Sequence, residues 1–325
     1  MKPDVLSYGE LLIDFSQHGK GPLGFPSYEA LPGGGVANMV VALARWGRPV
    51  AFSGRVGKDA LGSLLKKTLD DEGVDTTGLT SSPRPTTMAI VSLDDQGDRS
   101  FDFLWLGTSC DGLPVAVPRP EALPRIFHFS SVSMCVPEGR RNNLESARLH
   151  KKAGCLISFD PNLRESLWAD LNVARDAICE GLELSDIVKI SEEEVAFVLG
   201  EVRGDSGEQA RRLFERFQPS LLFVTRGAQG CHWFGANGSG SQSTPKVNVV
   251  DTTGAGDTFM AGVLHTLLAT GKAPHDLTRE ELAQAAAFSV AAGSASTTTR
   301  GGIPSLPSLE VVQNLLLRGS SLPPQ

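Results

Sequence analysis

The stretch that most constrains the fold of this chain runs from Val249 to Leu264 and reads VVDTTGAGDTFMAGVL. Short polar residues and Gly254-Ala255-Gly256 separate two valines from a segment whose apolar residues fall at helical spacing. This order predicts a strand, a tight loop and the start of a helix. The first backbone N–H groups of a helix have no intrahelical partner and favour an anion, above all a phosphate. The sequence therefore predicts a phosphate-binding turn here.

Asp257 is an unusual residue for such a turn, because its carboxylate would compete with a bound anion. A carboxylate at this position can instead accept the proton of a hydroxyl that attacks a phosphoryl group, while the N–H groups stabilise the developing charge. The structural alternative is an acidic residue in a first helical turn, with glycines that only make a turn. A GxGD pattern alone favours that alternative, because short glycine patterns match by chance.

The rest of the chain alternates apolar, β-rich runs with helical segments, which predicts an α/β fold with a mostly parallel central sheet flanked by helices. In such a sheet, ligands bind at the carboxyl ends of the strands. A second glycine-rich loop, LPGGGVAN, opens a helix, and the glycine- and serine-rich stretch 235–243 is typical of a turn. Expected strands cover residues 5–15, 50–56, 126–131, 155–160, 187–190 and 221–225.

Two further β-rich runs, 86–93 and 99–106, flank the polar sequence DDQGD and predict a hairpin. This hairpin interrupts the strand and helix alternation. We therefore assign it, together with the segment after Asp14, to a small β-sheet lid from roughly 15–32 and 86–112. The lid is expected to lie within a single domain that spans residues 1–325.

Composition excludes several classes of function. The net charge of −7 argues against nucleic acid or an anionic membrane surface as the main partner. No signal peptide follows Met1 and no apolar stretch reaches membrane-spanning length, so a cytoplasmic protein is expected. The five scattered cysteines and six histidines show no metal-binding spacing, so no zinc site is expected.

Longer motifs carry a resemblance to a known family. The twelve residues DTTGAGDTFMAG resemble throughout the second signature of the ribokinase-like (phosphofructokinase-B) carbohydrate kinases, and GGGVAN, with Gly57 and Gly62, resembles the first. The first signature departs at Val40, where the family prefers a small residue. GELLID, DPNLRESLW, SEEE and TRGAQG match in order, so the resemblance covers residues 5 to about 307. It implies a ribokinase-like fold and ATP-dependent sugar phosphorylation, with Asp257 as base and the backbone of Gly254, Ala255 and Gly256 as anion hole.

Further site residues follow from the resemblance, position by position. The implied sugar contacts are Asp14, Gly33, Gly34, Asn38, Arg99, Phe103 and Arg164, and the implied ATP contacts are Ser191, Thr225, Gly227, Gly254 and Gly256. Glu194 matches a residue that orders Mg²⁺ through water, and Asp251 and Thr253 match positions that hold K⁺ in some members. Structural alternatives remain: a strand end at Asp14, a helix cap at Asn38, and a solvated acidic helix start at 192–194.

Sugar identity is less constrained than the reaction. DPNLRESLW, GDRSFDF and STTTRGGIPSLP resemble fructokinases most, which implies phosphorylation of fructose on its 6-hydroxyl. However, Trp105 stands where fructokinases usually have arginine, and Val290 where many relatives have asparagine. A kinase for aminoimidazole riboside, ribose or 2-keto-3-deoxygluconate, a non-catalytic sugar or nucleotide sensor, and a nucleotide-binding structural subunit remain open. The exposed strand edges of a lid need a partner, and the resemblance implies a homodimer through the lid.

Overall fold

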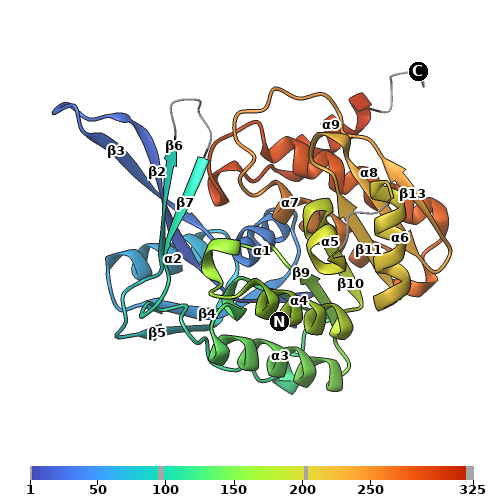
Figure 1. The fold of residues 1–325 in the computed structure, drawn as a ribbon, viewed down its shortest axis with the longest axis horizontal. Helices are drawn as coiled ribbons and strands as arrows, with labels where there is room; N and C mark the ends of the chain where they lie inside the picture. The colour runs from blue at the N-terminus through green and yellow to red at the C-terminus, as the bar shows by residue number, and fades with distance from the viewer. Residues whose placement is uncertain (1, 94–98, 201–203, 320–325) are drawn as a thin grey trace.

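The computed structural model describes residues 2–93, 99–200 and 204–319, and these form two β-sheets with surrounding helices (Figure 1). The main sheet has nine strands in the order β13-β12-β11-β10-β9-β8-β1-β4-β5. All neighbours from β11 to β5 are parallel, while β12 and β13 add an antiparallel edge. The strands are β1 Val5–Tyr8, β4 Val50–Gly57, β5 Asp75–Ser82, β8 Ile126–Ser130, β9 Leu156–Asp160, β10 Ile187–Ser191, β11 Leu221–Thr225, β12 Cys231–Gly235 and β13 Gly238–Gln242.

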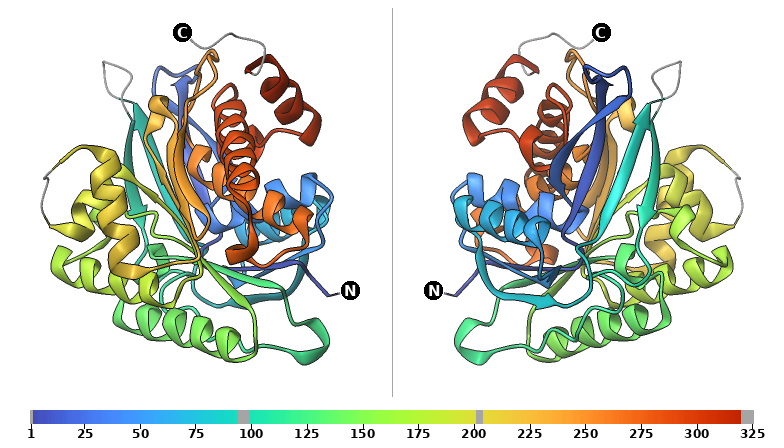
Figure 2. Two further views of the ribbon diagram at one scale, coloured as in Figure 1. Left: turned by 90° about the vertical axis from the view of Figure 1, so that its right-hand side faces the viewer. Right: turned by 90° about the vertical axis from the view of Figure 1, so that its left-hand side faces the viewer.

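Helices cover both faces of the main sheet, because its central strands carry apolar side chains on both sides (Figure 2). Phe52 and Phe223 belong to one apolar cluster, and Phe129 and Phe159 to the other. One face packs against α1 Gly35–Arg45, α2 Ala60–Asp71, α7 Ala255–Thr270, α8 Arg279–Ser296 and α9 Leu309–Gly319, and the other against α3 Pro137–Lys152, α4 Leu171–Leu184, α5 Glu192–Leu199 and α6 Ser206–Phe217. None of the helices described here is long and apolar enough to cross a bilayer.

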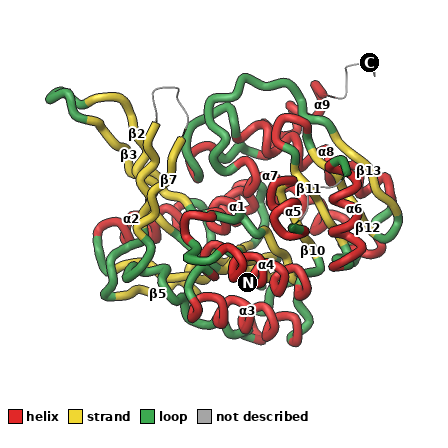
Figure 3. The backbone as a smooth tube through the Cα atoms, viewed as in Figure 1, coloured by secondary structure: helices red, strands yellow, loops and turns green. Residues whose placement is uncertain are grey.

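A smaller sheet stands beside the main one and projects to the left in Figures 1 and 3. Its order is β3-β2-β6-β7. The predicted hairpin is confirmed, since β6 and β7 pair antiparallel; the DDQGD turn lies outside the described residues. We call this sheet the lid. Its strands are β2 Leu12–Lys20, β3 Pro26–Gly33, β6 Met88–Leu93 and β7 Arg99–Leu104.

The single strand expected over residues 5–15 is wrong. β1 ends at Tyr8, and β2 starts at Leu12 in the other sheet. The chain changes direction at Gly9, whose φ of 151° suits glycine and where a Cβ would lie 2.8 Å from a methyl group of Val36. Asp14 therefore belongs to a lid strand rather than to the central sheet.

Near the DTTGAGD motif, one expectation is wrong and another holds only in part. The valines before it form no strand: Val250 and Asp251 both donate backbone N–H groups to Thr297 O. The expected turn at 235–243 is confirmed only at residues 236–237, and Gly238–Gln242 forms the edge strand β13. That strand has no apolar side chain to reveal it in the sequence, and Gly240 is needed because a Cβ there would lie 2.5 Å from the Trp233 ring.

Candidate functional site

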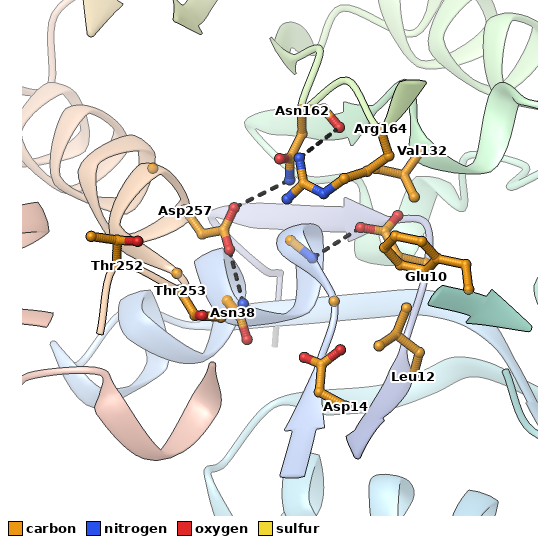
Figure 4. Close-up of a pocket in the computed structure, with 15 residues that line it drawn as sticks. Glu10, Leu12, Asp14, Asn38, Val132, Asn162, Arg164, Thr252, Thr253 and Asp257 are labelled. Atoms are coloured by element: carbon orange, nitrogen blue, oxygen red, sulfur yellow. Dashed lines mark hydrogen bonds between the residues drawn. The ribbon is translucent and has the colours of Figure 1, made fainter. Parts of the chain in front are cut away.

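A cavity of about 400 Å³ lies between the lid and the starts of α1 and α7, where the parallel strands end (Figure 4). Polar side chains from four stretches of the chain face it: 10–14, 38, 162–164 and 252–257. Such a concave site with few convergent polar groups is typical of small-ligand binding. Its lining residues are Glu10, Leu12, Asp14, Gly34, Gly35, Asn38, Phe103, Val132, Asn162, Arg164, Thr252, Thr253, Gly254, Gly256 and Asp257.

Asp257 lies in the first turn of α7 and is only 8% exposed. Its Oδ2 accepts a hydrogen bond from Asn38 Nδ2 at 2.8 Å, and its Oδ1 accepts one from Asn162 Nδ2 at 3.4 Å (Figure 4). Burial raises the pKa of Asp257, against the lowering effects of the Asn38 hydrogen bond and of the Lys189 and Arg164 charges. A buried carboxylate with a raised pKa can accept a proton from a bound hydroxyl.

The turn before α7 has the backbone geometry of an anion site. Gly254 precedes the helix with a φ of 79°, a left-handed conformation that favours glycine. Ala255 N donates to Thr252 O at 3.2 Å, while the N–H groups of Gly256 and Asp257 start the helix and have no intrahelical acceptor. These N–H groups and the helix dipole favour a phosphate at this point.

A buried ion pair lies under this turn. Lys189 Nζ is 3.0 Å from Asp160 Oδ2, and both side chains are almost fully buried. A Cβ at Gly256 would lie 2.8 Å from Lys189 Nζ, so the turn and the ammonium group are in contact. Although burial lowers the pKa of Lys189, the charges of Asp160 and Glu194 raise it overall, so this lysine carries a positive charge at neutral pH.

Comparisons with known proteins agree with this geometry. The model of the pfkB family of carbohydrate kinases matches residues 2–309. This chain belongs to that family. The kinase is 38% identical over 317 residues to fructokinase-1 of Zea mays, covering 95% of this chain and 96% of that relative.

Solved structures give the same result. A fructokinase from Xylella fastidiosa with bound ATP superposes with a TM-score of 0.86 at 30% identity and covers 99% of the kinase and 100% of that chain. A fructokinase double mutant from Vibrio cholerae in the fructose-, ADP- and potassium-bound form gives 0.84 at 30% identity, with 97% and 99% covered. The predicted family, the ribokinase-like α/β fold and the sugar kinase activity are confirmed.

Most of the residues predicted to contact the sugar line the cavity of the kinase, namely Asp14, Gly34, Asn38, Phe103 and Arg164. Gly33 does not line it; a Cβ there would lie 2.5 Å from Asp14 Oδ2. Arg99 lies in β7, and its side chain is outside what the structure describes.

Sequence reasoning missed several residues of the site, and three of them bear on its chemistry or shape. Glu10 and Gly35 line the cavity, and Lys189 lies under the turn. The available signals were weak: a lysine inside the apolar strand IVKIS, and a third glycine in GGG. A Cβ at Gly35 would lie 2.2 Å from Asn162 Nδ2, which explains why this glycine is needed.

A second cleft, of about 560 Å³, lies on the other side of the turn. Thr225 and Gly227, both predicted to contact ATP, line it, and so does Val290. Thr252 and Gly256 line both cavities, so the two meet at the start of α7. Apolar side chains dominate the remaining wall, which suits a flat nucleobase: Ala228, Pro245, Val247, Val249 and Phe259.

Ser191 and Glu194 lie away from this cleft, in a cavity of about 250 Å³ that Lys189 and Arg164 also line. They form a capping box at the start of α5, but Glu194 is only 8% exposed, unlike the side chain of a solvated acidic helix start. Glu194 accepts backbone hydrogen bonds from Leu163 N at 2.7 Å and Ser191 N at 2.8 Å. Burial raises the pKa of Glu194, and its carboxylate still faces the charge of Lys189.

Asp251 organises the loop before the turn. Its carboxylate accepts hydrogen bonds from Thr253 N at 2.9 Å and Gly301 N at 2.7 Å, which join the loop before α7 to the loop after α8. Within the described part of the chain, no group of three or more histidine, cysteine, aspartate or glutamate side chains is arranged to hold a metal ion.

Trp105, the residue that departs from the fructokinase pattern, is only 3% exposed. It packs with Leu12, Cys110 and Val132 at the base of the lid. Leu12 and Val132 also line the sugar-side cavity, so Trp105 supports one wall of that cavity from behind.

Proposed function

We propose that this kinase transfers the γ-phosphoryl group of ATP to the 6-hydroxyl of fructose, with Asp257 as the catalytic base. The observation that carries the proposal is the position of Asp257: its carboxylate lines the sugar-side cavity within the same helical turn that borders the nucleotide-side cleft. The similarity to fructokinases over nearly the whole chain supports fructose as the substrate.

The proposed reaction uses groups already in place. The carboxylate of Asp14 and the amide of Asn38 suit vicinal sugar hydroxyls, and Gly34 leaves room for them. Asp257 accepts the proton of the attacking hydroxyl, whose oxygen bonds to the γ-phosphorus as the bond to ADP breaks. The N–H groups of Gly256 and Asp257, with Lys189 beneath them, stabilise the charge that develops on the phosphoryl oxygens.

The nucleotide is proposed to bind with Mg²⁺, which when bound would neutralise phosphate charge. The donor set fits an ion held mainly by phosphates and water, because Glu194 already accepts two backbone hydrogen bonds. Glu194 would therefore act through water. Asp251 and Thr253 are proposed to lie next to K⁺; the potassium in the Vibrio cholerae fructokinase structure supports this proposal.

We also propose that two copies pair through their lids. The hairpin formed by β2 and β3 exposes large apolar side chains: Leu23 is 86% and Phe25 73% exposed, and Tyr28 on β3 is also exposed. Such a patch on an open sheet edge favours a partner. Light scattering should give twice the chain mass, and Phe25→Asp should lower it to one chain. A monomer at all concentrations of the unmodified protein would exclude this pairing.

The substrate is tested by ADP release with Mg²⁺ and ATP on fructose, ribose, 2-keto-3-deoxygluconate, aminoimidazole riboside and glucose, with and without K⁺. Preferential turnover of fructose is expected. Preference for another of these sugars would support the same reaction with a different substrate. The cavity wall supported by Trp105 would then be the first candidate for the cause of the changed specificity. Bound ATP without turnover of any sugar would favour a sensor.

The role of Asp257 is tested by Asp257→Asn. The variant should bind both substrates, as measured by calorimetry, and lose about 10²–10⁴-fold in kcat, because the amide cannot accept the proton. Near-normal turnover would show that another group is the base. Asp205→Asn, which changes an exposed helix cap of α6, serves as the matched control and should leave kcat unchanged.

A further inference from the structure

Glu10 occupies the place where the chain first passes from the main sheet into the lid. It lies between β1, which ends at Tyr8, and β2, which starts at Leu12. The chain returns from the lid through Gly34, which lies between β3 and Gly35, the first residue of α1. Glu10 is 1% exposed, yet it lines the sugar-side cavity.

The side chain and backbone of Glu10 hold these two passages together. Gly35 N donates to Glu10 Oε1 at 2.9 Å, and Ser130 Oγ donates to Glu10 Oε2 at 3.2 Å (Figure 4 shows the first bond). The backbones also touch, because a Cβ at Gly34 would lie 2.6 Å from Glu10 O. One carboxylate thus joins the outgoing chain, the returning chain and the end of β8.

The hydrogen bond from Gly35 N to Glu10 Oε1 caps the N-terminus of α1. The residue before α1 is Gly34, which has no side chain to accept from the first N–H groups of the helix, and the first turn of α1 contains no acidic residue. A carboxylate at this end also interacts favourably with the helix dipole. Glu10 therefore caps α1 from a distant segment, and α1 carries Asn38.

Burying the Glu10 carboxylate costs free energy of folding, because the charged form loses its contact with water. Burial, with a smaller contribution from the charge of Asp257, raises the pKa of Glu10 to about 7. A buried carboxylate is tolerated only when its hydrogen bonds are satisfied, and the groups that satisfy this one belong to the frame of the cavity. The hydrogen bonds of Glu10 therefore fix the positions of the segments that surround the cavity.

We propose that Glu10 is a positioning residue that holds the lid and the start of α1 in register, so that Asp14 on the lid and Asn38 on α1 face the same sugar. This inference rests on the proposed sugar site and on Asp257 as its base. Glu10 acts through Gly35 and Ser130, and the proton transfer itself is left to Asp257.

Glu10→Ala and Glu10→Gln test the proposal, because glutamine can keep both contacts: its amide oxygen can accept from Gly35 N, and its amide nitrogen can donate to Ser130 Oγ. Glu10→Ala should raise the KM for fructose about tenfold or more and lower kcat, while the KM for ATP stays within about twofold, because Glu10 does not line the nucleotide cleft. Glu10→Gln should restore the fructose KM to within about threefold of the original value.

Asp205→Ala is the matched control. It removes the cap of α6, where Asp205 accepts from Glu208 N at 2.9 Å, and it should lower thermal stability without moving either KM. An unchanged fructose KM in Glu10→Ala would overturn the proposal. So would a Glu10→Gln variant as impaired as Glu10→Ala, because the two hydrogen bonds would then not be the cause. If Glu10→Ala does not fold, Ser130→Ala removes one of the two hydrogen bonds to Glu10 and should raise the fructose KM; an unchanged KM would then overturn the proposal.

Failure of this inference is distinguishable from failure of the proposed base. If Asp257→Asn keeps turnover, the base is wrong, but the shift in fructose KM in Glu10→Ala can still be measured. If Asp257→Asn is inactive and Glu10→Ala behaves as the original enzyme, Asp257 is supported as the base and the positioning role of Glu10 is wrong.

Discussion

Asn38 Nδ2 donates a hydrogen bond to Asp257 Oδ2 at 2.8 Å, across 219 positions of the sequence. The two residues lie in the first turns of α1 and α7, and the starts of both helices line the same cavity. Helix N-termini favour negative charge. The bond therefore joins the two positive helix ends around one carboxylate, which steadies the base and favours the anionic groups of phosphoryl transfer.

Asn38→Ala should move the pH dependence of the reaction. The Asn38 hydrogen bond lowers the pKa of Asp257, so its loss raises that pKa further, and less of the base is ionised as pH falls. We expect kcat to fall about 10- to 100-fold at the acidic end of the profile and by less at its alkaline end. A profile of kcat against pH measures the shift. Asn237→Ala, a surface asparagine that bonds to two backbone carbonyls, is the control. The same loss at every pH would contradict the explanation.

Gly35→Ala should damage the site without damaging the fold. The backbone of Gly35 is compatible with alanine, but the added Cβ would lie 2.2 Å from Asn162 Nδ2 and 3.1 Å from Asp257 Oδ1. We expect kcat/KM for the sugar to fall by about 10² or more, because small displacements of reacting groups are costly. Steady-state kinetics and circular dichroism measure the two effects. Gly207→Ala, at a helical glycine of α6 remote from the cavities, should leave the kinetics unchanged; if Gly35→Ala does the same, the steric argument is wrong.

Lys189→Met should cost stability and activity by separable mechanisms. It leaves Asp160 as a buried carboxylate without its partner, which costs about 3–5 kcal/mol. Adding Asp160→Asn removes that carboxylate, so the double variant should recover much of the free energy of unfolding. Turnover should stay low, because the charge next to Gly256 is still missing. Urea unfolding and ADP release test the pair, and a double variant with restored turnover would show that the lysine charge serves stability alone.

Glu10→Gln should change how stability depends on pH. The pKa of Glu10 is raised from 4.5 to about 7 in the folded protein, which therefore binds more protons than the unfolded chain in this interval. Stability contributed by the group is present below about pH 4.5 and is lost as pH rises through about 7. Glutamine does not ionise, so the variant should gain up to about 3 kcal/mol over the original protein between about pH 5 and about pH 8. Urea unfolding at both pH values measures the free energy of unfolding of the two proteins. If the difference between them is the same at both pH values, the pKa of Glu10 is not raised as stated.

Much of the fold could be predicted from the sequence because the signals are local. The parallel strands carry continuous apolar runs, and the β6–β7 hairpin has alternating residues on both sides of a polar turn. The errors arise where contacts outweigh these patterns. β13 has no apolar side chain and exists because it pairs with β12. Val249 and Val250 form no strand because the N–H groups of Val250 and Asp251 bond to Thr297 O.

By itself, the sequence determined that Asp257 stands in the first turn of a helix, directly after a glycine turn that can hold an anion. Those features depend on backbone preferences that act over a few residues. Only the tertiary structure decided what surrounds that carboxylate: Asn38 from α1, the Lys189–Asp160 pair beneath the turn, and Glu10 at the entrance to the lid. Burial and charge reach across the fold between residues far apart in the chain, so the proton affinity of the base is a property of the packed molecule.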